Sequence, residues 1–415
     1  VSNPAVGDLA PNNGKQDGAP AIVAHGVLNT PTTPSPVEGK AAFNNPPYAY
    51  GIVERTFSEY KSSPLSETLV SNFINLPADL QTPGGSLDVT YQAALGAGTG
   101  GNYEDNTPRY FSCQSCHMRP YEAKGCNKNG APVRKDMPQH DHTGGNYWFA
   151  SMAQYQDRPD VGTLRLGGGL TSTQLLAMDL GQERATKHLR EAASLEVVDD
   201  KVKVTNLTGH KLITGYPEGR RMWLRIEWRD EDDQIIDIYG DYGPLLDDNG
   251  TPLVTVTNSD GIEVPVESIL DLTGTNTRIY EAHYAVTKDW ATTIQALHGD
   301  SFALSYDRIA GAVKCTVKQF IDGVDGCTGE YHNTFHFALN NYVSHDNRIP
   351  PYLMSYDEAK KRNALPVPDT QYRDTGVSTY NHWDTLTLIP PTEYNPYYGR
   401  SGTATPHHAH IQLLY

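Results

Sequence analysis

The sequence predicts a mainly β protein in which an irregular, partly helical N-terminal region is joined to an antiparallel β-sandwich. From Leu195 to the C-terminus, short segments such as "WLRIEW", "SFALSY" and "WDTLTLIP" alternate apolar and polar residues, with turn-forming residues between them. The 415 residues include 37 Gly, 28 Pro and 25 Tyr, a composition that favours turns over long helices. The sequence shows no repeat of about 20 to 50 residues, which excludes a solenoid.

Residues 1–165 make up the irregular N-terminal region, because they contain many Pro, Gly and Asn and few periodic segments. One helix is predicted there, in "VERTFSEYKSS". Thr56 and Glu59 occupy the positions of a capping box, and Pro64 ends the helix.

A longer helix is predicted within residues 166–194, which connect the two main regions. Its apolar residues recur near the 3.6-residue period, at Leu175, Met178, Ala185, Leu189 and Ala192. His188 is the neighbour of one of these positions, and we expect it to be a solvated surface histidine. Residues 195–415 then form the predicted β-sandwich domain.

Charge and hydropathy exclude two classes of partner. The chain has 49 acidic and 33 basic residues and a formal charge of −16, so its field repels nucleic acid and anionic lipid. No run approaches the roughly 18 apolar residues of a membrane span. The polar start "VSNPAVGDLAPNNGKQDG" has no signal peptide, and we expect Val1 to be a processed start.

The segment "FSCQSCHM" places two residues between Cys113 and Cys116, and His117 follows directly. In a CxxCH motif, two thiols bond to the vinyl groups of a haem and the histidine becomes an axial ligand of the iron. The chain has one such motif, which predicts one covalent haem c. The alternative is a zinc site, in which Cys126 with His140 or His142 would supply the other ligands.

The remaining cysteines indicate the kind of cellular compartment in which the protein works. Cys315 and Cys327 flank "TVKQFIDGVDG", whose turn residues favour a hairpin-like loop closed by a disulfide. The alternative for this pair is two buried thiols, and Cys126 is left without a predicted partner. Covalent haem and a disulfide both indicate an exported protein.

The sixth ligand of the iron decides between electron transfer and catalysis, because catalysis needs an open position. His140 is the preferred second metal ligand beside His117, since a loop of about twenty residues can wrap the haem edge and the glycines of "DHTGG" ease its passage. His210, on a turn in "NLTGHKLITG", is the next candidate for cofactor binding. His25 and His142 follow it.

Two other features have ordinary explanations. Arg220 and Arg221 fit strand-edge salt bridges, with binding of the haem propionates as the alternative. The carboxylates of "RDEDDQ" and "DDNG" are ligands that Ca²⁺ prefers. Neither stretch has the spacing of an EF-hand loop, so we expect solvated hairpin turns.

Several blocks of the sequence resemble exported c-type cytochromes of metal-reducing and related bacteria: "ERTFSEYKSSP", "CQSCHM", "VRKDMPQHDHTGGNYW", "NLTGHKLITGYPEGRRMWLRIEW" and "DNRIPPYLMSYDEAKKRNALPVP". The resemblance implies a haem-bearing N-terminal region, a β-sandwich, and electron transfer in the periplasm or at the cell exterior. Such proteins often carry a further upstream CxxCH. Here Ala21 and Ala24 stand in place of its thiols and His25 is kept, so the resemblance implies the loss of one haem site.

The sequence therefore predicts an exported mono-haem cytochrome that carries electrons. Its partners would be other redox proteins or cytochromes, or copies of itself in an oligomer or filament. Two alternatives stay open: a peroxidase-like haem enzyme with an open sixth position, and a structural protein with an incidental haem. The sequence contains no HExxH motif, P-loop or dinucleotide fingerprint.

Overall fold

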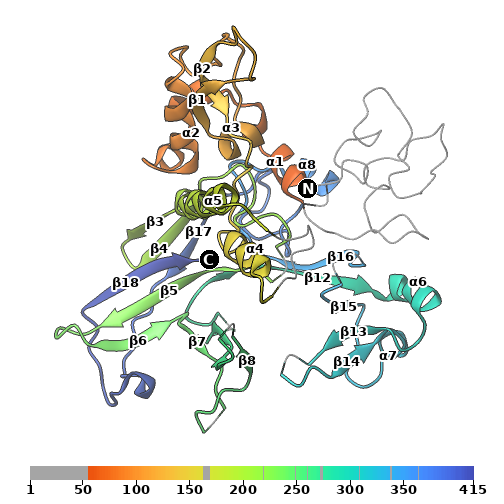
Figure 1. Cartoon of the computed structure of the whole chain (residues 1–415). Helices are drawn as coiled ribbons and strands as arrows, with labels where there is room; N and C mark the ends of the chain where they lie inside the picture. Colours follow the sequence, from red (N-terminus) through yellow and green to blue (C-terminus); the bar gives the residue numbers. More distant parts are fainter. Residues whose placement is uncertain are drawn as a thin grey trace.

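The structure is a computed structural model that describes residues 55–161, 169–217, 219–247, 249–258, 260–271, 274–307, 309–336, 339–362 and 364–415 (Figure 1). Ala21, Ala24 and His25 lie outside the described residues. In Figure 1, helices α2 and α3 with strands β1 and β2 lie at one end of the molecule, the long strands of the C-terminal part lie at the other, and helix α5 lies between them.

The N-terminal region consists of short helices around a small core. The core contains Leu65, Val70, Phe73 and Leu87, and it also takes in Leu207 from the C-terminal part of the chain. The elements are α1 (Thr56–Lys61), η4 (Pro64–Glu67), η5 (Val70–Asn75), η6 (Ala78–Gln81), α2 (Ser86–Leu95), α3 (Cys113–His117), β1 (Pro120–Lys124) and β2 (Val133–Pro138).

Helix α1 forms where the sequence predicts it, but the capping-box prediction is wrong. Arg55 is at the N-cap position, and the Glu59 carboxylate points into the interior. It accepts hydrogen bonds from Thr214 Oγ1 at 2.6 Å and from the guanidinium of Arg348 at 2.9 Å. Glu59 therefore makes a charge-assisted hydrogen bond to a buried guanidinium in place of a helix cap.

The connecting helix is confirmed as α5 (Ser172–Glu191), which follows α4 (Phe149–Asp157). Thr171 Oγ1 accepts a hydrogen bond from the Gln174 backbone N–H, and the Gln174 side-chain oxygen accepts one from the Thr171 backbone N–H, so a capping box begins the helix. Helix α5 then runs directly into the first strand of the sandwich, β3 (Ala193–Val198).

Two antiparallel sheets make the sandwich. Strand β4 (Lys201–Asn206) pairs with β3 on one side and β17 (Trp383–Thr387) on the other. In the second sheet, β5 (Met222–Arg229) pairs with β18 (His408–Leu414), β6 (Ile235–Tyr239) and β11 (Ile279–Tyr280). One core cluster contains residues of both sheets, including Val202, Val204, Leu224, Ile226 and Ile236. The mainly β prediction is confirmed.

The C-terminal part also contains a second lobe, which the sequence did not separate from the sandwich (Figure 1). Its core gathers Val286, Trp290, Ile294 and Phe320 around the disulfide between Cys315 and Cys327, so that disulfide prediction is confirmed. The lobe consists of β12 (Ala282–Thr287), α6 (Lys288–His298), β13 (Ala303–Tyr306), β14 (Val313–Thr316), α7 (Val317–Asp322), β15 (Tyr331–Asn333) and β16 (Tyr342–Asp346).

Short hairpins and helices complete the described chain: β7 (Tyr242–Pro244), β8 (Thr255–Thr257), β9 (Glu263–Pro265), β10 (Glu267–Ile269), α8 (Tyr356–Lys361) and η7 (Pro396–Tyr398). Within the part of the chain that the structure describes, no helix has the length and apolar character needed to cross a bilayer.

Candidate functional site

A cavity of about 840 Å³ lies where the N-terminal region, helix α5 and the loop after β4 meet. Its volume is within the range of sites that hold small molecules and cofactors. Apolar side chains including Phe57, Leu65, Leu87, Leu189 and Met222 line much of it. Cys113, Cys116 and His117 line it as well, so the predicted attachment motif opens into this cavity.

The CxxCH motif is presented by the short helix α3. Ser112 caps this helix, because its side chain accepts from the Ser115 backbone and Ser115 bonds back to Ser112. The Cys116 thiol lies 3.6 Å from Thr90 Oγ1 on α2. The single turn of helix therefore carries both thiols and the imidazole to one cavity wall.

The imidazole of His117 is oriented by the backbone of the loop after β2. Its Nδ1 lies 2.5 Å from the carbonyl oxygen of Thr143. A carbonyl only accepts, so Nδ1 carries the proton and Nε2 is the nitrogen with the lone pair. This is the arrangement in which a ligand histidine is held for a metal. Burial, followed by the proximity of His210, lowers the pKa of His117 to about 4, so the ring is neutral at physiological pH.

A backbone carbonyl also orients the imidazole of His210. Its Nδ1 lies 3.0 Å from the Lys211 carbonyl oxygen and 3.3 Å from Thr208 Oγ1. The carbonyl contact assigns the proton to Nδ1, which leaves Nε2 as the ligand atom. The ring centres of His117 and His210 lie 6.1 Å apart, with 19° between the ring planes.

That distance matches a pair of axial ligands. An imidazole nitrogen about 2.0 Å from a metal puts its ring centre about 3 Å away, so two opposed imidazoles have centres about 6 Å apart. His210, the second candidate ligand in the sequence, lines the cavity. The described lining residues do not include His140, whose side chain is exposed to solvent.

Two more histidines reach the cavity. The ring centres of His142 and His188 lie 6.2 Å and 5.6 Å from that of His117. The expectation of a solvated surface position for His188 is wrong: helix α5 turns this residue toward the cavity, and burial together with Arg119 lowers its pKa to about 3. In the sequence, its position next to the apolar Leu189 indicated that it could lie near the buried face of the helix. Helix periodicity alone does not show whether that face packs on a core or on a cavity.

The two neighbouring arginines, Arg220 and Arg221, have different surroundings. Arg220 lines the cavity, whereas Arg221 pairs with Glu281 at 2.5 Å, as a strand-edge salt bridge. Arg119 is held by Glu191 at 2.7 Å next to the motif. Arg220 is therefore the cation placed to meet an anionic group in the cavity.

Cys126 does not support the zinc alternative, because it is an exposed thiol. Among the described residues, the group of three or more metal-binding side chains within 4.8 Å of one another is Asp233, His408 and His410, which includes neither Cys126 nor the motif cysteines.

Comparisons with known proteins add little to this geometry. No protein-family model matches the chain, and no curated protein matches it. Among solved structures, it is similar to a penta-heme cytochrome c552 from Thermochromatium tepidum, at 11% identity over 55% of this chain and 83% of that chain, with a TM-score of 0.12. A TM-score of this size is no evidence of a shared fold.

Proposed function

We propose that this protein is an electron carrier with one haem c, attached through Cys113 and Cys116 and held by His117 and His210. The observation that carries the proposal is the pair of imidazoles in the cavity, with ring centres 6.1 Å apart and each Nδ1 facing a backbone carbonyl. In place of His140, which is exposed, we propose His210 as the sixth ligand.

The fit of the cavity to a haem rests on its donor set. Two thiols and an imidazole on α3 face apolar side chains, and Arg220 lies on the lining for a carboxylate of the cofactor. A haem bound there would supply a one-electron couple. If His117 and His210 both held such a haem, no position on it would remain for peroxide, which would favour electron transfer over the enzyme alternative.

The residues of the chain have separate tasks in this proposal. The Thr143 and Lys211 carbonyls fix the tautomer of each ligand histidine, so that Nε2 is available to the metal. The apolar lining excludes water, which limits reorganisation of the surroundings when the charge changes. Tyr147, Trp148 and Phe149, exposed on the loop into α4, offer a surface where another redox protein, or another copy of the chain, could approach.

Export to the periplasm or the cell exterior remains a proposal. It is supported by the disulfide between Cys315 and Cys327, because such bonds persist in oxidising compartments. Labelling of thiols in protein denatured directly from cells, with and without a reductant, tests it: because both cysteines are buried, they are compared unfolded, and the pair should be labelled only after reduction.

The ligand proposal is tested by the optical and electron paramagnetic resonance spectra of single variants. His210→Ala should convert a low-spin haem to high spin and admit carbon monoxide. His140→Ala is the matched control and should leave the spectrum unchanged. A low-spin His210→Ala protein would contradict the assignment. The same measurement on His142→Ala and His188→Ala would then show which cavity histidine is the ligand, and a high-spin native protein would favour the enzyme.

A further inference from the structure

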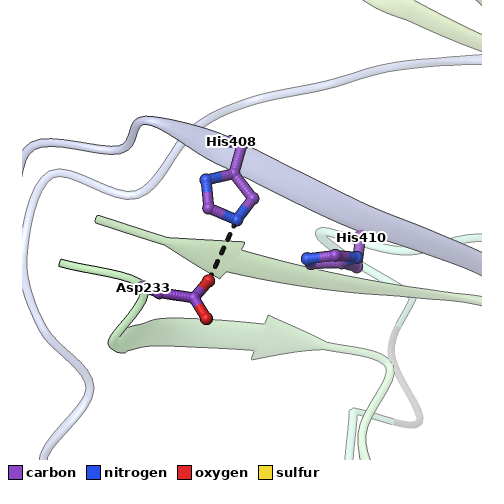
Figure 2. Close-up of side chains that lie close together, drawn as sticks. All are labelled: Asp233, His408 and His410. Atoms are coloured by element: carbon purple, nitrogen blue, oxygen red, sulfur yellow. Dashed lines mark ion pairs between the residues drawn. The ribbon is translucent and has the colours of Figure 1, made fainter. Parts of the chain in front are cut away.

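A second group of possible metal ligands lies outside the cavity, at one end of the β5–β6–β18 sheet. His408 and His410 are two residues apart on strand β18, opposite Arg229 and Glu227 of β5. Because side chains alternate along a strand, both rings project from the same face. Asp233 belongs to the turn between β5 and β6, and Figure 2 shows the His408 ring directed at its carboxylate.

The spacing of the ligand atoms suits a single ion. His408 Nε2 lies 3.2 Å from Asp233 Oδ1. Two ligands about 2.0 to 2.1 Å from one ion at the tetrahedral angle lie about 3.3 Å apart, so this pair already has the separation that a bound ion requires. One nitrogen or oxygen atom from each of the three residues lies within 4.8 Å of the others. His410 is exposed, so a rotation of its side chain can close the remaining distance.

His407 supports the orientation of His408. The Nδ1 atoms of the two rings are 3.4 Å apart. With a metal on its Nε2, His408 would carry its proton on Nδ1 and donate it to His407. Such a hydrogen bond from the outer nitrogen is usual for metal-bound histidines.

The local charge permits a cation. Arg229 is a positive group beside the site, with Nη1 3.6 Å from Asp233 Oδ2. Its guanidinium is also paired with Glu227 at 2.5 Å, and Glu227 is shared with Arg225, which pairs in turn with Asp241. Two positive and three negative charges leave these five residues at −1, within a chain of net charge −16. A divalent ion therefore meets a favourable field.

The ligand types indicate which ion. Two imidazoles and one carboxylate suit Zn²⁺ and related transition metals, whereas Ca²⁺ and Mg²⁺ prefer oxygen ligands alone. The acidic turn "RDEDDQ" alone suggested only a hard cation. The histidines that the fold brings beside it from β18 change that preference.

We propose that Asp233, His408 and His410 form a binding site for a divalent transition metal of the Zn²⁺ class, separate from the haem cavity. Water completes the coordination, since the site is open to solvent. A bound ion would tie the β5–β6 turn to strand β18.

The test uses the full-length protein with its haem attached, dialysed against Zn²⁺ and then analysed for metal content. The variants are His410→Gln, His408→Gln and Asp233→Asn, and the matched control is His298→Gln, which alters an exposed histidine at the end of α6. Circular dichroism and the haem spectrum establish that each variant is folded.

The native protein and His298→Gln should hold about one Zn²⁺ more than the three site variants, with affinity lowered at least about tenfold in each variant. A large excess of Ca²⁺ should not displace the Zn²⁺. Equal Zn²⁺ content in the native protein and His410→Gln would overturn the proposal, as would displacement by Ca²⁺. Loss of Zn²⁺ in His407→Ala but not in His410→Gln would overturn the ligand set.

Discussion

Replacement of Glu59 by Gln should destabilise the whole protein, because Glu59 belongs to a buried cluster of four charges. Arg348 donates to Glu59 at 2.9 Å and to Asp346 at 2.7 Å, and Lys211 Nζ lies 2.7 Å from Asp346. All four residues are at most 3% exposed. Two positive and two negative charges balance in the native cluster.

The Glu59→Gln variant removes one negative charge and leaves a net charge of +1 in the interior. Its amide oxygen can still accept from Thr214 and from the Lys211 backbone, which are the partners of Glu59 Oε2. The amide NH2 then faces the guanidinium of Arg348, which only donates, so the cost combines an unbalanced buried cation with the loss of this hydrogen bond. Breaking such a pair typically costs about 3–5 kcal/mol, so we expect a loss near the lower value.

Denaturation by urea, followed by circular dichroism and by the haem absorbance, measures this loss. The matched control is Glu67→Gln, whose side chain is 80% exposed and whose partner Lys61 lies 3.7 Å away; it should cost less than about 1 kcal/mol. The double variant Glu59→Gln/Arg348→Met leaves Lys211 paired with Asp346 and should lose less than the sum of the single variants. A Glu59→Gln protein within about 0.5 kcal/mol of the native one would refute the reasoning.

Three other outcomes are expected. Replacing both Cys315 and Cys327 by Ala opens a loop with a sequence separation of 12 residues and should cost about 3 kcal/mol in denaturant unfolding; an unchanged midpoint would contradict this. Burial raises the pKa of Asp346, but Arg348 and Lys211 outweigh it and lower the pKa from 3.8 to about 2. Ionised Asp346 therefore adds roughly 2 kcal/mol to the free energy of unfolding above pH 4, and this contribution is lost as the pH falls through 2. A free energy of unfolding that does not change between pH 4 and pH 2 would contradict this. Residues 195–415, which the sequence assigns to a β-sandwich domain, would lack Glu59 and the partners of Leu207; we propose that this fragment gives no cooperative thermal transition by circular dichroism, and a sharp transition would contradict that.

Local patterns predicted the elements that depend on local chemistry. Helix α5 and the alternating strands β4 and β5 form where the sequence indicates. The disulfide was also predictable, because its cysteines flank a short loop with turn residues.

Features that depend on contacts distant in sequence were not predictable. Glu59 fits a capping box locally, and its buried partner Arg348 is 289 residues away. His188 lies on a helix whose period shows an apolar face but not the cavity beneath it. His140 was favoured by loop length, yet the adjoining Asp141 is held by Arg184 of α5 at 2.5 Å, and it is His142 that reaches the cavity.

The central claim, one covalent haem on Cys113 and Cys116, is tested most directly by mass spectrometry of the purified protein under denaturing conditions. The account predicts a mass equal to the chain plus one haem, and a Cys113→Ser/Cys116→Ser variant that releases all haem on denaturation. A native chain with no added mass, with two haems, or with haem that dissociates on denaturation would contradict it.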